Sequence, residues 1–199
     1  QVLDALITCY DRAGYHSVSA VDLLDAADKA IKSAGDGTEF GALARDVTES
    51  ILEAAYEYRD EQIATTFVHG DITRDNVYRS ERGTKIIDWG SSGYKLVLYD
   101  LMIQEFYTAT PQFWMGVRTA PRVEWFDNHF FGGLPALLEG MRQRGRVKLS
   151  LSDIKANMVL SLLQKTTESI YRYRVVNETE GVEFFTHIDK IRNALCKAA

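Results

Sequence analysis

The sequence predicts a predominantly α-helical α+β fold with one small β-hairpin. Apolar residues recur at helical spacing before residue 62 and again after residue 100. The stretch between these regions is rich in Thr, Val, Ile and Phe and carries turn signals, which favour short strands. With 46% hydrophobic and 26% charged residues, the composition is that of an ordinary globular protein. The 199 residues can bury a sizeable core, as one ordinary domain or two small ones.

Three helices are expected first, and we predict no strand before or between them. The first covers residues 2–13 and ends before Gly14. The second begins after Ser19, a residue type that caps helix N-termini, and is closed by Gly35. Thr38 is placed to cap the third.

Short strands are expected in the middle of the chain. Residues 64–68 are predicted to form a buried strand, because Thr, Phe and Val are favoured in such strands. Residues 76–78 and 85–87 are predicted to pair as a hairpin around a turn at residues 80–83.

Helical periodicity returns at Asp100 and continues, with a break at Gly132-Gly133, through the rest of the chain. Ser150 or Ser152 would cap a long helix, and a final helix follows it. The predicted fold is therefore helical on both sides of a small β segment.

Charge and cysteine content narrow the classes of function. A net charge of −5 argues against a general nucleic-acid binder. No apolar run approaches the ~18 residues that span a bilayer, and no signal peptide is visible. Cys9 and Cys196 have no ligand spacing, so they indicate neither a zinc site nor a disulfide framework. We therefore expect a cytoplasmic protein without nucleic-acid or membrane partners.

Oxygen-bearing side chains are concentrated between Phe67 and Asp88. Asp71 is followed five positions later by Asn76, and Asp88 comes twelve positions beyond that. Such residues suit Mg²⁺, which prefers one or two protein carboxylates together with waters and phosphate oxygens. Asn76 and Asp88 could face one cation across the hairpin, and Asp71 would orient an attacking hydroxyl and take its proton. The set predicts phosphoryl transfer.

His69 and Gly70 precede Asp71 directly. A lone histidine is weak evidence for a metal ligand, so we expect His69 to be buried, to bond to loop backbone and to hold the aspartate in place. Gly70 is expected to allow a tight backbone approach.

Residues 69–71, Asn76 and residues 87–89 together closely resemble the catalytic core of the aminoglycoside phosphotransferase/choline kinase family. The resemblance implies the C-terminal lobe of a protein-kinase-like fold, with the small hairpin carrying the catalytic residues. It implies an enzyme that uses Mg²⁺ and ATP or GTP to phosphorylate a hydroxyl of a small molecule. Carried over residue by residue, it makes Asp71 the catalytic base, and Asn76 and Asp88 the Mg²⁺ ligands.

Tyr99-Asp100-Leu101 resembles a later element of the same family, in which the aspartate is mainly structural. We expect Asp100 to cap the next helix and, together with His69, to support the site.

On this resemblance, residues 1–62 are N-terminal helices of the lobe, residues 63–101 hold the catalytic loop and metal-binding hairpin, and residues 102–199 form a helical acceptor-side subdomain. Nothing before Phe67 looks like the five strands and glycine-rich loop of the family's N-terminal nucleotide lobe. The chain is then either a fragment of a longer kinase or a natural half-kinase. Because it also begins at Gln1, we expect the fragment, inactive alone and completed by that missing lobe.

Two other functions compete with this hypothesis. A non-catalytic kinase-like module would bind a protein partner, but it needs none of Asp71, Asn76 and Asp88. Metal-dependent hydrolysis of a phosphate ester would require further His or Asp ligands that the sequence does not supply. The sequence leaves open the acceptor (an aminoglycoside, choline, ethanolamine, homoserine, a sugar or a protein hydroxyl), the nucleotide and the oligomeric state.

Overall fold

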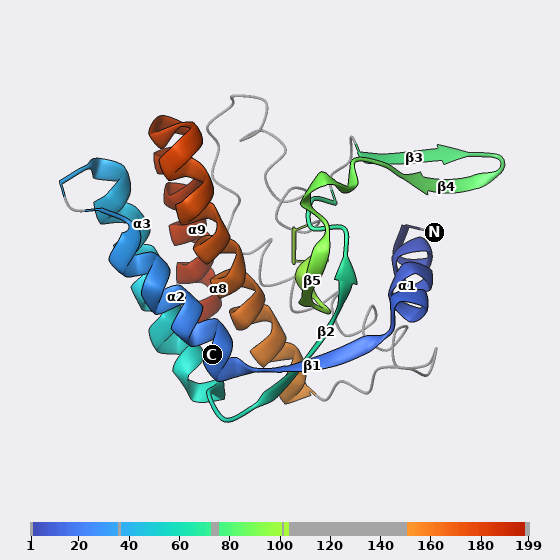
Figure 1. Cartoon of the computed structure of the whole chain (residues 1–199), viewed down its shortest axis with the longest axis horizontal. Helices are drawn as coiled ribbons and strands as arrows, with labels where there is room; N and C mark the ends of the chain where they lie inside the picture. Colours follow the sequence, from blue (N-terminus) through green and yellow to red (C-terminus); the bar gives the residue numbers. More distant parts are fainter. Residues whose placement is uncertain (1, 36, 73–75, 101, 104–150, 198–199) are drawn as a thin grey trace. The chain divides into compact units, whose positions relative to one another are not determined.

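The computed structural model describes residues 2–35, 37–72, 76–100, 102–103 and 151–197. It divides into two compact units, one of Gln1–Val18 with Ile63–Met158 and the other of Ser19–Gln62 with Val159–Ala199. Long helices and two small antiparallel sheets confirm the predicted α+β class (Figure 1). The helices and the break predicted between residues 104 and 150 lie outside the described residues.

The first unit is built on a three-stranded sheet in the order β1-β2-β5, preceded by the predicted first helix (Figure 1). The bounds are α1 Val2–Ala13, β1 Tyr15–Ser19, β2 Gln62–Val68 and β5 Gly93–Leu96. Strands β2 and β5 are antiparallel, with Phe67 opposite Tyr94 and Val68 opposite Gly93. The predicted central strand is thus confirmed and is extended by two residues at its start.

Strands β1 and β5 correct the prediction, which placed no strand between the first two helices and none after the hairpin. Both are only four or five residues long, and neither shows a clean alternation of buried and exposed residues. Their sequences carry little strand signal of their own, because strand propensity depends on what a segment packs and pairs with. Pairing with β2 decides their conformation.

The predicted hairpin is confirmed, with β3 at Val77–Ser80 and β4 at Gly83–Ile86. Val77 pairs with Ile86, and the chain reverses at residues 81–82. The amide of Ile87 donates to the carbonyl of Asn76 at 3.0 Å, which continues the pairing by one residue beyond the strands. Asn76 and the residue before Asp88 therefore lie side by side where the hairpin opens.

The second unit is a set of packed helices, of which α2, α3 and α9 run side by side (Figure 1). The bounds are α2 Ala20–Ser33, α3 Glu39–Ala55, the short η1 Tyr56–Tyr58, α8 Leu151–Val176 and α9 Glu178–Lys197. Helix α8 begins in the first unit and belongs to the second from Val159 onward. The predicted second, third, long and final helices are all present.

Helix capping is confirmed at one predicted N-terminus and differs at the others. Thr38 Oγ1 accepts a hydrogen bond from the Gly41 amide at 3.0 Å, as a capping threonine should. Ser19 stands at the cap position of α2, but its side chain makes no capping bond. Ser152 lies inside α8, which begins at Leu151, so it is not the cap; Ser150 lies outside the described residues.

A close approach between α3 and α9 forms the centre of the second unit. An added Cβ at Gly181 would lie 2.6 Å from ring atoms of Phe40, so any other residue there would force the packed ring to move. The Phe40 ring meets Phe185 edge-to-face at 5.8 Å. These rings are buried together with aliphatic side chains of α2, α3, α8 and α9. No helix in the described part of the chain is both long enough and apolar enough to cross a membrane.

Candidate active site

The loop that leaves β2 is fixed by its own histidine. His69 is fully buried; its Nε2 donates to the carbonyl of Ile87 at 2.7 Å, and its Nδ1 accepts from the amide of Asp71 at 3.3 Å. Because a carbonyl only accepts and an amide N–H only donates, this pattern requires the tautomer with its proton on Nε2. The imidazole thus joins the loop to the segment after β4.

Gly70 brings the same two segments into contact. Its φ of +81° is in the left-handed region, and an added Cβ would lie 2.2 Å from the backbone oxygen of Ser91. Both observations demand glycine. The tight approach expected of Gly70 is therefore made to the segment that begins at Asp88.

Asp100 holds the loop from the other side. Its Oδ2 accepts from the His69 amide at 2.8 Å, and its Oδ1 accepts from the Gly70 amide at 2.7 Å. Tyr10 donates its hydroxyl proton to Oδ2 at 2.8 Å. Burial raises the pKa of Asp100 above its ordinary value, and the bonds from the Gly70 amide, the His69 amide and Tyr10 oppose this rise.

The expectation that Asp100 caps its own helix was wrong. Asp100 already lies within the helical segment that starts at Tyr99, and its carboxylate bonds to amides about thirty residues earlier. The physical reason is that the amides of His69 and Gly70 are buried with the loop after β2 and require acceptors, because leaving such groups unpaired is costly.

Asn76 and Asp88 lie at the open end of the hairpin. The Asn76 side-chain nitrogen donates to the backbone carbonyl of Asp71 at 2.9 Å, so the remaining polar atom of its amide is an oxygen acceptor. Asp88 is exposed and adopts φ 58°, ψ 66°; in the described ranges it is the one non-glycine residue with a positive φ. Such a conformation costs about 1–2 kcal/mol, and strain of this kind clusters at functional sites.

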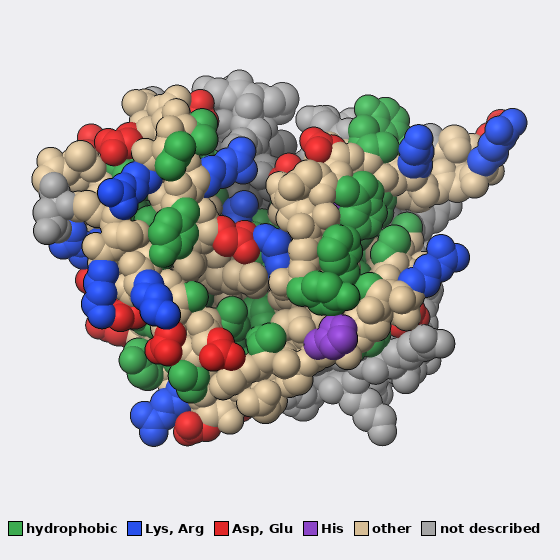
Figure 2. Space-filling model, viewed as in Figure 1, with side chains coloured by type: hydrophobic (Ala, Val, Ile, Leu, Met, Phe, Trp, Pro, Cys, Tyr) green, Lys and Arg blue, Asp and Glu red, His purple; other side chains and the backbone are tan. Residues whose placement is uncertain are grey.

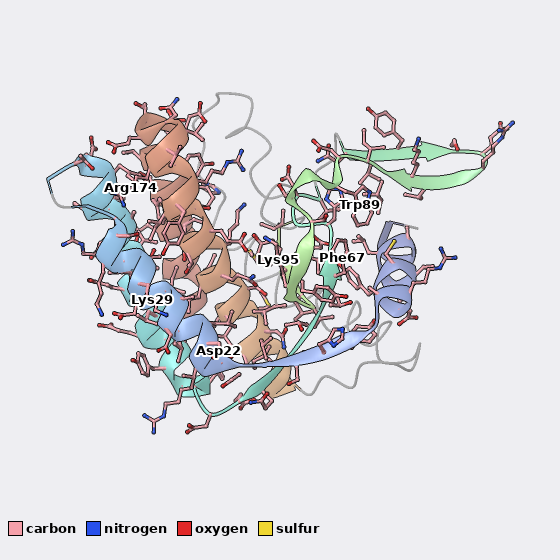
Figure 3. The ribbon with its side chains drawn as sticks, viewed as in Figure 1. Asp22, Lys29, Phe67, Trp89, Lys95 and Arg174 are labelled. Atoms are coloured by element: carbon pink, nitrogen blue, oxygen red, sulfur yellow. The ribbon has the colours of Figure 1, made fainter. Side chains whose placement is uncertain are left out.

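Trp89 joins this site to the sheet through an aromatic row, which consists of Trp89, Phe67 and Tyr94. Its ring meets His69 edge-to-face at 4.8 Å and stacks on Phe67 at 6.5 Å, and its Nε1 donates to the Ile86 carbonyl at 3.1 Å. Phe67 in turn meets Tyr94 at 5.6 Å. Figure 2 shows hydrophobic side chains gathered on this surface, and in Figure 3 Phe67 and Trp89 lie on the side of β5 opposite Lys95.

Lys95 points away from the aromatic row. Its Nζ lies 4.4 Å from the centre of the buried Tyr99 ring, a cation–π contact. Its Cε lies 3.4 Å from where a Cβ of Gly70 would be, so the stem of this lysine also borders the loop. The loop is therefore enclosed by Ser91, Lys95 and Asp100.

A family model, described as the phosphotransferase enzyme family, matches residues 15–142, which is more than half of the chain and includes the part of this site between His69 and Asp100. The chain belongs to that family. The match confirms the resemblance stated from the motifs at residues 69–71 and 87–89. A search of curated proteins found no match.

Two solved structures of kinases are similar to this chain. A glucosamine kinase has 15% identity and a TM-score of 0.52, covering 95% of this chain and 49% of its own. The amicoumacin kinase hAmiN, in complex with AMP-PNP, Ca²⁺ and Ami, has 14% identity and a TM-score of 0.48. The match covers 82% of this chain and 49% of the hAmiN chain. The likeness to the glucosamine kinase shows a shared kinase-like fold. This chain spans about half the length of each of these two structures.

The donor set formed by Asn76 and Asp88 fits Mg²⁺ better than a metal held wholly by protein. Within the described ranges, no group of three or more His, Cys, Asp and Glu side chains could hold a metal ion. One amide oxygen and one carboxylate at the open end of the hairpin suit a cation that keeps waters and binds phosphate oxygens. Residues 73–75, between Asp71 and Asn76, lie outside the described part.

Sequence reasoning missed Tyr10 entirely as a residue of the site. Its local pattern indicates only that it is one of the apolar positions at helical spacing in the first helix. No local signal could have found it, because its partner Asp100 lies 90 positions away.

Proposed function

We propose that this site transfers the γ-phosphoryl group of ATP or GTP to a hydroxyl of a small molecule that is aminoglycoside-, choline- or sugar-like. In this proposal Asp71 is the catalytic base, and Asn76 and Asp88 hold Mg²⁺. His69 and Asp100 support the loop that carries Asp71. We further propose that the reaction takes place in the cytoplasm.

The observation that carries the proposal is the junction between the loop after β2 and the segment after β4. Gly70 against Ser91, and His69 bonded to Ile87, keep the loop of Asp71 next to the segment of Asp88. The bond from Asn76 to the Asp71 carbonyl attaches the third residue to the same loop. One set of contacts thereby holds three residues with oxygen-bearing side chains, which lie 5 and 12 positions apart in sequence.

When bound, Mg²⁺ and the nucleotide supply charge neutralisation and the transferred phosphoryl group. Asp71 has the task of orienting the acceptor hydroxyl and accepting its proton. The Asn76 oxygen and the Asp88 carboxylate have the task of fixing the cation relative to Asp71. Because phosphoryl transfer needs positioning more than covalent help, a rigidly held loop matters as much as the three side chains themselves.

The activity of the whole protein is part of the proposal. Because the chain covers 49% of the similar glucosamine kinase structure, we propose that it works together with a nucleotide-binding lobe outside these 199 residues. The test therefore uses the product of the full reading frame that contains this chain.

The experiment measures nucleotide consumption with ATP and with GTP, with and without Mg²⁺, over a panel of aminoglycosides, choline, ethanolamine, homoserine and sugars. We expect Asp71→Asn to lower kcat by about 10²–10⁴-fold, the usual effect of removing a general base. Asp88→Asn is expected to raise the Mg²⁺ concentration needed for half-maximal rate. The matched control is Asp25→Asn, at an exposed carboxylate on α2, which should leave the rate unchanged.

Rates of Asp71→Asn and Asp88→Asn equal to that of Asp25→Asn would contradict the assigned roles. If the wild-type product showed neither turnover nor Mg²⁺-dependent nucleotide binding in calorimetry, the enzyme hypothesis would fail. The non-catalytic module that binds a protein partner would then be the better hypothesis.

A further inference from the structure

We propose that Tyr10, on helix α1, is a positioning residue of the phosphotransfer site that acts through Asp100 on the loop carrying Asp71. The proposal rests on the proposed function for its catalytic consequence. Its structural part, a hydrogen-bonded relay from α1 to the loop, can be tested without turnover.

The relay consists of three bonds to one buried carboxylate. The Tyr10 hydroxyl donates to Asp100 Oδ2, the same oxygen accepts from the His69 amide, and Oδ1 accepts from the Gly70 amide, all at 2.7–2.8 Å. Tyr10 is 1% exposed, and Asp100 and His69 are fully buried. Three donors converge on two oxygens, which is the pattern of an ionised carboxylate rather than a protonated one.

Helix α1 holds Tyr10 firmly enough to act as an anchor. Thr66 Oγ1, on β2, donates to the carbonyl of Gly14 at 2.8 Å and approaches the carbonyl of Tyr10 at 3.4 Å. The Gly14 amide also bonds to the Tyr10 carbonyl at 2.9 Å. The C-terminal end of α1 is thus attached to β2, the strand that leads into the loop. The position of the Tyr10 hydroxyl is therefore fixed relative to the loop.

Loss of the Tyr10 hydroxyl would weaken the ionised form of Asp100. Burial already raises the pKa of this carboxyl, and the bond from Tyr10 is one of the contributions that oppose the rise. Within the described residues, the titratable side chains in electrostatic interaction with Asp100 include Tyr10 and Cys9 from α1 and His69 from the loop. Without the hydroxyl, protonation of Asp100 becomes easier, and a protonated oxygen accepts the loop amides less well.

The variant Tyr10→Phe keeps the buried ring and removes only the hydroxyl. The matched control is Tyr15→Phe, because Tyr15 also donates to a carboxylate, Asp11 Oδ1 at 3.0 Å, away from the loop. The first measurement follows the ¹⁵N–¹H signals of His69 and Gly70 in this chain as pH is lowered. We expect the midpoint of their titration to move to higher pH in Tyr10→Phe and to stay in place in Tyr15→Phe.

The second measurement is kcat against pH for the product of the full reading frame. We expect Tyr10→Phe to lower kcat by about tenfold, to leave the KM for the acceptor within about twofold, and to move the acidic limb of the profile to higher pH. A tyrosine that merely packs in the core would change stability without moving this limb.

The two measurements separate the two hypotheses. An unchanged amide titration in Tyr10→Phe, with wild-type turnover present, would overturn the role of Tyr10 and leave the proposed function standing. Absence of turnover in the wild-type product would overturn the proposed function and the catalytic consequence of Tyr10. A shifted amide titration would in that case still establish the relay itself.

Discussion

The substitution Gly70→Ala tests how rigidly the two halves of the site are joined. The added Cβ would lie 2.2 Å from the backbone oxygen of Ser91 and 3.0 Å from its carbonyl carbon. Ordinary C···O contacts are about 3.3–3.6 Å, so the loop and the Ser91 segment would have to separate by roughly 1 Å. No flexible side chain can absorb this clash, because the atoms concerned belong to the backbone.

The expected cost follows from two separate contributions. A non-glycine residue at φ +81° costs about 1–2 kcal/mol, and an extra methyl group in a packed position costs about 1–3 kcal/mol. Gly70→Ala should therefore lower the free energy of unfolding by about 2–5 kcal/mol. Gly14→Ala is the matched control, because Gly14 has φ +83° and nothing within 4 Å of an added Cβ. The control should lose only about 1–2 kcal/mol.

The assay is urea denaturation of both variants followed by circular dichroism, together with kcat of the full reading frame product. A displacement of about 1 Å at Asp71 is expected to cost on the order of 10²-fold in kcat, whereas Gly14→Ala should remain active. If the two variants lost the same free energy of unfolding, the contact between Gly70 and Ser91 would not be a rigid junction, and the reasoning about the site would be refuted.

Two further predictions concern a buried carboxyl and a helix cap. Burial raises the pKa of Asp100, so the folded state binds the proton of this carboxyl more tightly than the unfolded chain does. The stabilisation from this proton binding is fully present below the unfolded pKa and is lost as pH rises through the folded pKa. The stability difference between wild type and Asp100→Asn should therefore narrow as pH rises from about 4 in urea titrations; a constant difference would contradict the shift. Thr38→Ala should cost about 1 kcal/mol in thermal unfolding, and Ser19→Ala, whose side chain makes no capping bond, less than about 0.5 kcal/mol. Equal losses would show that the Thr38 bond contributes nothing.

Local signals in the sequence were sufficient for the helices and the hairpin. The glycine after residue 13, the capping threonine at residue 38 and the turn before Gly83 each act within a few residues of the boundary that they set. Strands β1 and β5 could not be predicted in the same way, because they exist only as partners of β2. Their residues come from segments that are far apart in the chain.

For the candidate site, the motifs were sufficient to select Asp71, Asn76 and Asp88 and to identify the family, which the family model confirms. The roles of these three residues stay predictions. The positive φ of Asp88, and the contact of Gly70 with Ser91, could not be read from residue types alone.

The sequence by itself determined the helical α+β class, the hairpin and the family of this chain, because periodicity, capping and motif spacing are properties of neighbouring residues. Only the tertiary structure decided what Asp100 and Tyr10 do. Asp100 satisfies amides of the loop rather than its own helix, and Tyr10 completes that carboxylate from 90 positions away. The physical reason is that buried polar groups must find partners in space, and the fold alone determines which groups meet.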